Sequence, residues 1–215
     1  MKLHTYFRSS AAFRVRIALN LKKLDYEHAF VNLVKGEQRS DAYLALNPQG
    51  LVPALEEDGR LFTQSLAIIE YLDERHPEPP LVPRDTIGRA RVRALALAIA
   101  CDIHPLNNTR VLQYLERDLG LSTEQRNAWY AHWIAEGFRA FEQALAAPET
   151  GRFCHGDTPT LADIALVPQV FNAHRFKCDV EPYPRIRRIH EACLAISAFR
   201  DAAPENQSDA VAVKS

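Results

Sequence analysis

The sequence has little cysteine, almost no net charge and no long apolar run. Only four cysteines occur in 215 residues, and none of them has a C-x-x-C or metal-ligand spacing. A formal net charge of −1 gives no general attraction to nucleic acid or to an anionic membrane. No apolar run approaches the roughly 18 residues that read as a membrane span. We therefore expect reduced thiols, no metal site, and a cytoplasmic protein that binds neither nucleic acid nor membrane.

The first third of the chain alternates strand and helix patterns. It predicts, in order, a strand, a helix, a strand, a helix, two strands and a helix. The Asp58-Gly59 pair predicts a hairpin between the last two strands. Ser9 or Ser10 is the natural N-cap of the first helix, whose partial positive charge favours an anion. These two residues fit a binding site for a thiolate, phosphate or carboxylate, and they fit a plain N-cap equally well.

The rest of the chain is predicted to be helical. Four prolines within residues 77–85 indicate a linker, so we expect one domain at 1–80 and a second at 88–215. Thr160-Leu161-Ala162-Asp163 is typical of a capping box that opens a helix. Pro168 is expected to kink that helix without ending it, because the apolar pattern continues beyond the proline. The tail from Glu205 is expected to be loose.

This order of elements resembles the glutathione transferases, which join a thioredoxin-like βαβαββα domain to an all-helical domain. The markers are Val52-Pro53, Gln64-Ser65 with the apolar run that follows, and the 160–163 capping box. The opening Arg8-Ser9-Ser10-x-x-x-Arg14-Val15-Arg16 is narrower and resembles the zeta class, whose best-known members are maleylacetoacetate isomerases. The resemblance therefore implies an α/β plus all-α fold with glutathione as cofactor.

The resemblance also implies a set of site residues. Glutathione binding falls on Gln38, Val52, Pro53, Gln64, Ser65, His104, Asn108, Thr109 and Arg110, with Gln49 as a weaker candidate. Catalysis falls on Ser9, Ser10, Arg8 and Arg175. Val52–Pro53 is implied to be a cis peptide that pairs with the cysteinyl unit, and Ser65 with the third helix is implied to bind the γ-glutamyl carboxylate. Ser9 is implied to favour the thiolate of glutathione.

The sequence departs from the zeta class at Ala11. Many members of the class carry a cysteine at that position, and the reductive dehalogenases among them use it for disulfide exchange. Isomerisation uses the sulfur of glutathione itself, so Ala11 disfavours dehalogenation and leaves isomerase chemistry possible.

The implied activity is the cis–trans isomerisation of a maleyl-type diketo acid by thiolate addition, bond rotation and elimination. The leading substrate is maleylacetoacetate, from aromatic amino-acid breakdown, and maleylpyruvate is a close second. A general glutathione transferase and a non-catalytic interaction module are the remaining alternatives. The paired carboxylates of such substrates lead us to expect binding arginines. A homodimer is expected from the same resemblance.

Overall fold

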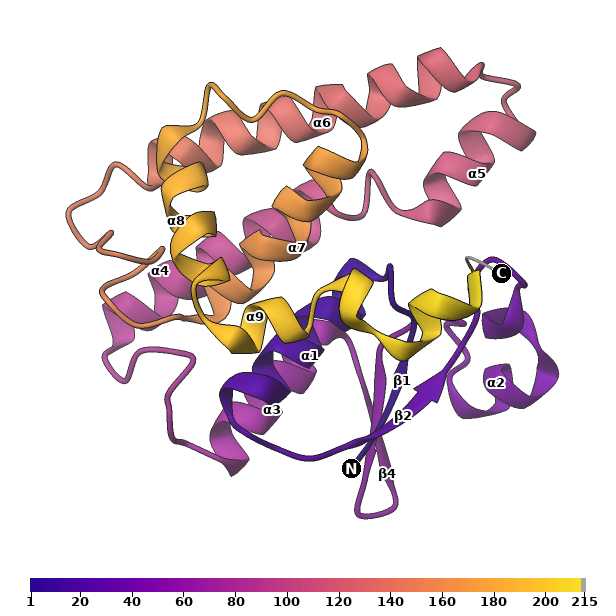
Figure 1. Cartoon of the computed structure of the whole chain (residues 1–215), viewed down its shortest axis with the longest axis horizontal. Helices are drawn as coiled ribbons and strands as arrows, with labels where there is room; N and C mark the ends of the chain where they lie inside the picture. The colour runs from indigo at the N-terminus through magenta and orange to yellow at the C-terminus, as the bar shows by residue number, and fades with distance from the viewer. Residues whose placement is uncertain (214–215) are drawn as a thin grey trace. The chain divides into compact units, whose positions relative to one another are not determined.

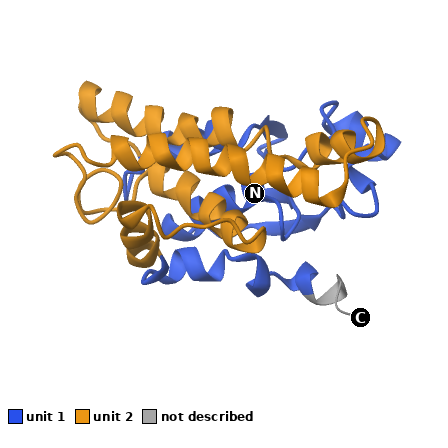
Figure 2. Ribbon diagram, turned by 90° about the horizontal axis from the view of Figure 1, so that it is seen from above, with its two compact units in different colours: residues 1–81, 194–215 blue, residues 82–193 orange. Residues whose placement is uncertain are grey.

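The computed structural model describes residues 1–213, with side chains through residue 210. Its contacts divide the chain into two compact units. Unit 1 contains Met1–Leu81 together with the chain from Leu194, and unit 2 contains Val82–Cys193 (Figure 2). The predicted division had placed all of 88–215 in one domain. The chain from Leu194 instead returns to the N-terminal unit.

Unit 1 contains a four-stranded sheet with the order β2-β1-β3-β4. β1 pairs parallel with β2 and antiparallel with β3, and β3 pairs antiparallel with β4. Helices α1 and α3 pack together on one side of this sheet, and α2 lies on the other (Figure 1). The element bounds are β1 Lys2–Thr5, α1 Ser10–Leu21, β2 Glu27–Phe30, α2 Asp41–Leu46, β3 Ala54–Glu57, β4 Arg60–Thr63 and α3 Ser65–Arg75. The predicted thioredoxin-like βαβαββα order is confirmed.

The turn between β3 and β4 has the conformation that its sequence predicts. Asp58 and Gly59 both have positive φ, at 50° and 73°. Glycine adopts such angles without a steric cost and aspartate tolerates them better than most residues, which explains the Asp-Gly pair at this tight hairpin.

Apolar burial of α1 holds unit 1 together. Its side chains Val15, Ile17 and Leu19 are completely buried, and Phe13 is 2% exposed. Each such side chain contributes roughly 1.5–3 kcal/mol by leaving water. The site at the start of α1 is thus carried by the most deeply buried helix of this unit.

The C-terminal segment packs on the outer side of α1. Helix α9, Ser197–Asp201, contacts α1, and the Asn20 side chain donates to the carbonyl of Ala198 at 3.0 Å. Pro204, Gln207 and Ala210 beyond it are buried. The prediction of a loose tail from Glu205 is therefore wrong for residues 205–210, because polar and apolar contacts to unit 1 hold them. Residues 214 and 215 lie outside the described part of the chain.

Unit 2 is helical in all of its regular elements. The helices are α4 Thr86–Leu97, α5 Thr109–Arg117, α6 Thr123–Ala144, α7 Leu161–Arg175 and α8 Pro184–Leu194, and the π-helical segment η2, Ala98–Ile103, follows α4. The capping box at the start of α7 is confirmed, since the Asp163 carboxylate accepts from the Thr160 N–H at 2.8 Å. Pro168 lies within α7 without ending it, as predicted. None of the described helices combines the length and the apolar composition that a membrane-spanning segment needs.

Candidate functional site

Ser9 caps the first helix and lies directly after the turn that leaves β1. Its side-chain oxygen accepts a hydrogen bond from the Ala12 N–H at 3.2 Å, and its backbone is extended, as an N-cap requires. The sequence left Ser9 and Ser10 as alternatives, and the structure identifies Ser9 as the cap. A hydroxyl that accepts one bond keeps its own hydrogen to donate. Ser10 is the first residue of α1 and is 6% exposed.

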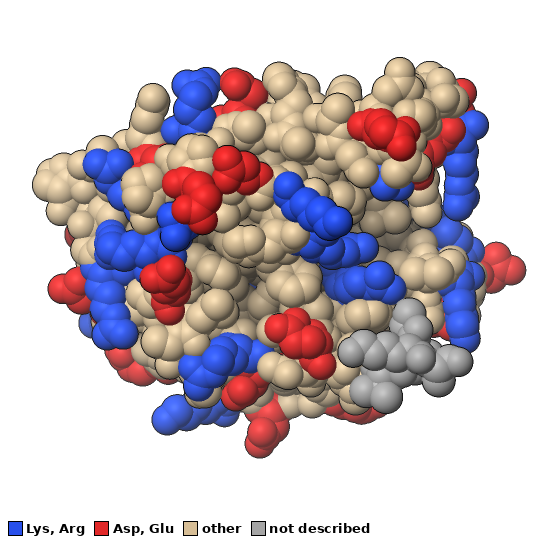
Figure 3. Space-filling model, turned by 45° about the horizontal axis from the view of Figure 1, so that its top comes forward, with Lys and Arg blue, Asp and Glu red and all other residues tan. Residues whose placement is uncertain are grey.

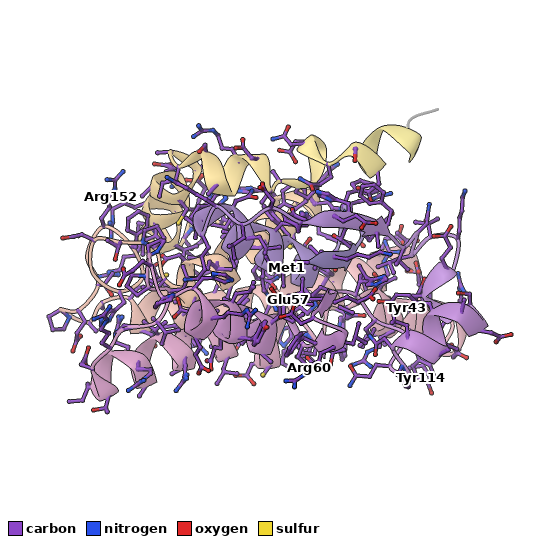
Figure 4. The ribbon with its side chains drawn as sticks, turned by 90° about the horizontal axis from the view of Figure 1, so that it is seen from below. Met1, Tyr43, Glu57, Arg60, Tyr114 and Arg152 are labelled. Carbon is purple, nitrogen blue, oxygen red and sulfur yellow. The ribbon has the colours of Figure 1, made fainter. Side chains whose placement is uncertain are left out.

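The Val52–Pro53 segment is a second backbone element of the site. The peptide bond between these residues is cis, as the resemblance implied. The preceding carbonyl, of Leu51, accepts from the Tyr43 hydroxyl at 2.7 Å and from the Asn47 side chain at 2.8 Å. Tyr43 is labelled in Figure 4. Two side chains from α2 and its C-terminal end thus fix the entry to β3.

Hydrophobic contacts join the Val52 segment to the residues before Ser9. A buried cluster in unit 1 contains Tyr6, Phe7, Val31, Tyr43, Val52 and Ala210. The end of β1 and the entry to β3 are therefore packed on shared apolar neighbours, although the residues are 45 positions or so apart in the chain.

Gln64 and Ser65 start helix α3. Gln64 has φ of 67°, a left-handed conformation that costs a non-glycine residue roughly 1–3 kcal/mol and that concentrates at functional sites. Its side-chain amide donates to Gln49 Oε1 at 3.2 Å. Ser65 is buried, and its hydroxyl accepts from Arg14 Nη1 at 3.3 Å. The start of α3 thus combines unpaired helix N–H groups, a hydroxyl and a guanidinium, which suits a carboxylate.

Gln38 lies on the same side of unit 1 as Gln49. A Cβ atom on Gly50 would come within 2.9 Å of the Gln38 carbonyl oxygen, so only glycine allows the two loops to approach this closely. The φ of Gly50 is also positive, at 60°. The sequence-predicted residues Gln38, Gln49 and Gln64 are therefore linked through adjoining loops.

Arg8 stands beside the serines in the loop that precedes α1. Its guanidinium carbon lies 4.7 Å from the centroid of the Phe7 ring, a cation–π distance. The Arg8 Nε atom is buried and has no hydrogen-bond partner among the described residues. Arg8 thus directly precedes Ser9 in the chain, and its guanidinium contacts the Phe7 ring.

The remaining predicted residues belong to unit 2. His104, Asn108, Thr109 and Arg110 form the turn between η2 and α5 and the first residues of α5. Asn108 caps α5 by accepting from the Arg110 N–H at 3.1 Å. Helix α6 holds this turn, since the indole of Trp129 donates to the Leu106 carbonyl at 2.9 Å.

Arg175 is the last residue of α7 and is exposed. Its guanidinium carbon lies 5.2 Å from the Phe176 ring centroid, and Phe176 stacks on Tyr130 with centroids 3.8 Å apart. Trp129 and Tyr130 are neighbours on α6, so one stretch of that helix supports both Arg175 and the His104–Asn108 turn. Burial raises the pKa of Tyr130, which keeps its hydroxyl neutral.

Arg14 lies within the opening motif, but the sequence pattern alone gives it no role. Arg14 is only 2% exposed and bonds to Ser65, which lies 51 positions later in the chain. An arginine on the buried face of an apolar helix is unusual, and this feature of the sequence could have identified Arg14.

On the face shown in Figure 3, acidic and basic side chains are both spread over the surface.

The chain is similar to known proteins over nearly its whole length. The family described as glutathione S-transferase, N-terminal domain, matches residues 3–80, and the corresponding C-terminal domain family matches residues 127–192. A maleylacetoacetate isomerase of Pseudomonas aeruginosa is 51% identical over 97% of this chain and 98% of its own.

Two solved structures are similar at a TM-score of 0.95. One is a holo structure of a maleylpyruvate isomerase, described as a bacterial zeta-class glutathione transferase, with 52% identity over 97% of this chain and 99% of its own. The other is a maleylacetoacetate isomerase of Methylobacterium extorquens AM1 with bound malonate and glutathione, with 42% identity over 98% of this chain and 99% of its own. The chain therefore belongs to the zeta class of the glutathione S-transferase family.

Proposed function

We propose that the chain is a glutathione-dependent cis–trans isomerase that converts maleylacetoacetate to fumarylacetoacetate. The observation that carries this proposal is the joint presence of the Ser9 cap, the packed Val52–Pro53 segment and the Ser65–Arg14 pair in one compact unit. Relatives of 51% and 42% identity bear the name maleylacetoacetate isomerase. The residues of unit 1 fit glutathione, because they offer separate positions for its thiol, its backbone and a carboxylate.

The thiol end of glutathione is assigned to the first turn of α1. Bound glutathione supplies the thiolate that adds to the substrate alkene and leaves again after the bond has rotated. The Ser9 hydroxyl donates a hydrogen bond to that sulfur, and the N-terminus of α1 adds its partial positive charge. Both effects favour the thiolate over the thiol. Ser10 assists with its backbone N–H.

The other groups of glutathione are assigned to the loops around α3. Ser65 and Gln64 bind the γ-glutamyl carboxylate, with the Arg14 guanidinium behind the Ser65 hydroxyl at 3.3 Å. Val52 and Pro53 bind the cysteinyl unit, and Gln38 binds the glycyl end. In unit 2, His104, Asn108, Thr109 and Arg110 contribute further contacts to glutathione.

The substrate carboxylates are assigned to arginines. Arg8 and Arg175 hold them and stabilise the negative charge that develops on the substrate carbonyl oxygen. A maleylacetoacetate isomerase of Methylobacterium extorquens AM1 has bound malonate, a small dicarboxylate, which supports the proposal of a dicarboxylate site in this chain. Maleylpyruvate is the second candidate substrate, favoured by the 52% identical maleylpyruvate isomerase.

The proposal extends to the setting of the enzyme. Its four free cysteines suit a cytoplasmic location, and the names of its relatives suit aromatic amino-acid catabolism.

A homodimer is also part of the proposal. Helix α4 exposes Ile87 and Leu97, at 79% and 46%, with the exposed Ala94 between them. This apolar stripe suits the contact surface of a homodimer.

A side-by-side assay tests the proposed activity. Purified protein is given each cis diketo acid, with and without glutathione, and formation of the trans isomer is followed. We expect glutathione-dependent turnover of maleylacetoacetate that exceeds turnover of maleylpyruvate, and a large loss of both in Ser9→Ala. Faster turnover of maleylpyruvate would reverse the order of the two substrates. No isomerisation of either acid would refute the proposal.

A further inference from the structure

The C-terminal segment reaches the loop that precedes Ser9. The backbone N–H of Phe7 donates to the Asp209 Oδ2 atom at 2.9 Å. The two residues are 202 positions apart in the chain and lie in the same compact unit. Phe7 lies two positions after the end of β1 and two positions before the Ser9 cap.

A second charged side chain holds the other polar group of Phe7. Arg16 is completely buried, and its Nη2 atom donates to the Phe7 carbonyl at 3.0 Å. Its Nη1 atom donates to the Tyr6 carbonyl at 3.4 Å. Hydrogen bonds with one charged partner are shorter and about twice as strong as neutral ones. Both the donor and the acceptor of Phe7 are therefore bound by ionised groups, one on either side.

Apolar contacts of the same segment support this arrangement. Ala210 belongs to the buried cluster that also contains Tyr6, Phe7 and Val52. The residue next to Asp209 therefore packs on the loop that leads to Ser9 and on the Val52 segment. The two backbone elements of the site share one support from the C-terminal segment.

The charges of Asp209 and Arg16 compensate one another in part. Burial lowers the pKa of the Arg16 guanidinium to about 10, and the negative charge of Asp209 opposes that shift. Arg16 thus stays protonated at neutral pH. A buried cation depends on nearby negative charge, so neutralising position 209 also weakens the hold of Arg16 on the loop.

Attachment of the C-terminal segment to unit 1 does not by itself explain why Asp209 contacts Phe7. The preceding helix is already held, because Arg16 Nε donates to the Ala202 carbonyl at 3.0 Å and Asn20 donates to the Ala198 carbonyl. The Asp209 Oδ1 atom is buried and has no hydrogen-bond partner among the described residues. The Asp209 carboxylate therefore interacts with the Phe7 N–H, by a hydrogen bond, and with the positive charge of Arg16.

We propose that Asp209 is a positioning residue for the thiol site, which fixes the Phe7–Ser9 loop so that the Ser9 hydroxyl and the start of α1 face the sulfur of glutathione. The inference rests on the proposed function. Asp209 acts through Phe7 and does not itself touch the reacting atoms. The enzyme thus completes its N-terminal site only when the C-terminal segment has docked.

The test compares Asp209→Ala and Asp209→Asn with Glu205→Gln, which neutralises an exposed carboxylate of the same segment. The first readout is hydrogen exchange of the Phe7 amide in the full-length protein without ligand. The second is glutathione affinity by calorimetry, together with the ultraviolet absorbance of the bound thiolate. Circular dichroism establishes that each variant is folded.

We expect Asp209→Ala to exchange the Phe7 amide faster and to lower glutathione affinity, each by roughly ten- to a hundredfold. The thiolate absorbance should fall as well. Asp209→Asn keeps an uncharged acceptor, so its losses should be smaller, and Glu205→Gln should match the wild type. If Asp209→Ala does not fold, Asp209→Asn and the wild-type exchange rate decide the question.

Three results separate failure of the inference about Asp209 from failure of the proposed function. If the wild type binds glutathione as thiolate and the folded Asp209 variants do so equally well, the inference is overturned and the proposed function stands. A wild-type Phe7 amide that exchanges as fast as an exposed amide also overturns the inference alone. If the wild type forms no glutathione thiolate, the proposed function fails and the positioning role fails with it.

Discussion

The Arg14 guanidinium donates to the Ser65 hydroxyl across the interior of unit 1, with 3.3 Å between Nη1 and Oγ. Arg14 is on α1 and Ser65 is the first residue of α3. The pair therefore ties the helix that carries the Ser9 cap to the helix that is assigned the γ-glutamyl carboxylate. Arg14 is 2% exposed and Ser65 is 7% exposed, so water does not weaken this contact.

Ser65→Ala is expected to weaken glutathione binding by roughly 1–2 kcal/mol, since a hydrogen bond to a charged group is lost. Calorimetry at fixed pH measures the change. Ser122→Ala is the matched control, because Ser122 caps α6 in unit 2 and lies outside the proposed site. Equal affinity of Ser65→Ala and the wild type would move the carboxylate to another position.

Arg175→Ala is expected to lower turnover of the cis diketo acid and to leave glutathione affinity nearly unchanged. Conjugation of chlorodinitrobenzene, which has no carboxylate, should change much less. The variant Arg117→Ala, at the exposed end of α5, controls for loss of a surface charge. Equal losses on the charged and the uncharged substrate would contradict the role of Arg175, because misfolding lowers both activities together.

His190 is expected to make the fold sensitive to acid. Burial and the nearby His174 lower its pKa from 6.5 to about 4 in the folded protein. As pH falls, the unfolded chain therefore takes up this proton first, so the stabilisation is complete above pH 6.5 and is lost between 6.5 and about 4. The full effect is on the order of 1–3 kcal/mol.

Urea unfolding at a series of pH values across this window measures the loss. The variant His190→Gln has no imidazole to protonate at this position, so its free energy of unfolding should fall less steeply than that of the wild type. Identical slopes for the two proteins would show that other groups carry the acid sensitivity.

Leu97→Asp is expected to weaken the proposed homodimer, because it places a charge on the apolar stripe of α4. Light scattering at micromolar concentration should give a dimer for the wild type and a smaller mass for the variant. The variant Glu191→Gln, at an exposed position on α8, serves as the control for a surface substitution. A wild-type protein that is only monomeric would count against the dimer.

Local features of the fold were predictable because the signals are local. The hairpin followed from Asp58-Gly59, the cap of α1 from two serines, and the capping box of α7 from the Thr160–Asp163 spacing. The cis bond at Pro53 followed from the resemblance, since residue chemistry alone favours a trans proline.

The contacts that support the site are not local and were missed. Arg14 meets Ser65 over 51 positions, and Asp209 meets Phe7 over 202. Nothing in the pattern around Asp209 distinguishes it from the acidic and polar residues of a loose tail. Its partner is a backbone group, which carries no sequence signal. Only the folded chain reveals such a contact.

In the proposed mechanism, the sulfur of glutathione acts as the nucleophile at the start of α1. The most direct test replaces glutathione by ophthalmate, which has the same two carboxylates and peptide bonds and lacks the sulfur. Isomerisation of maleylacetoacetate is then measured with each peptide at saturation. We expect ophthalmate to bind and to support no isomerisation, whereas glutathione should support many turnovers without being consumed. Isomerisation with ophthalmate, or consumption of one glutathione for each product formed, would contradict it.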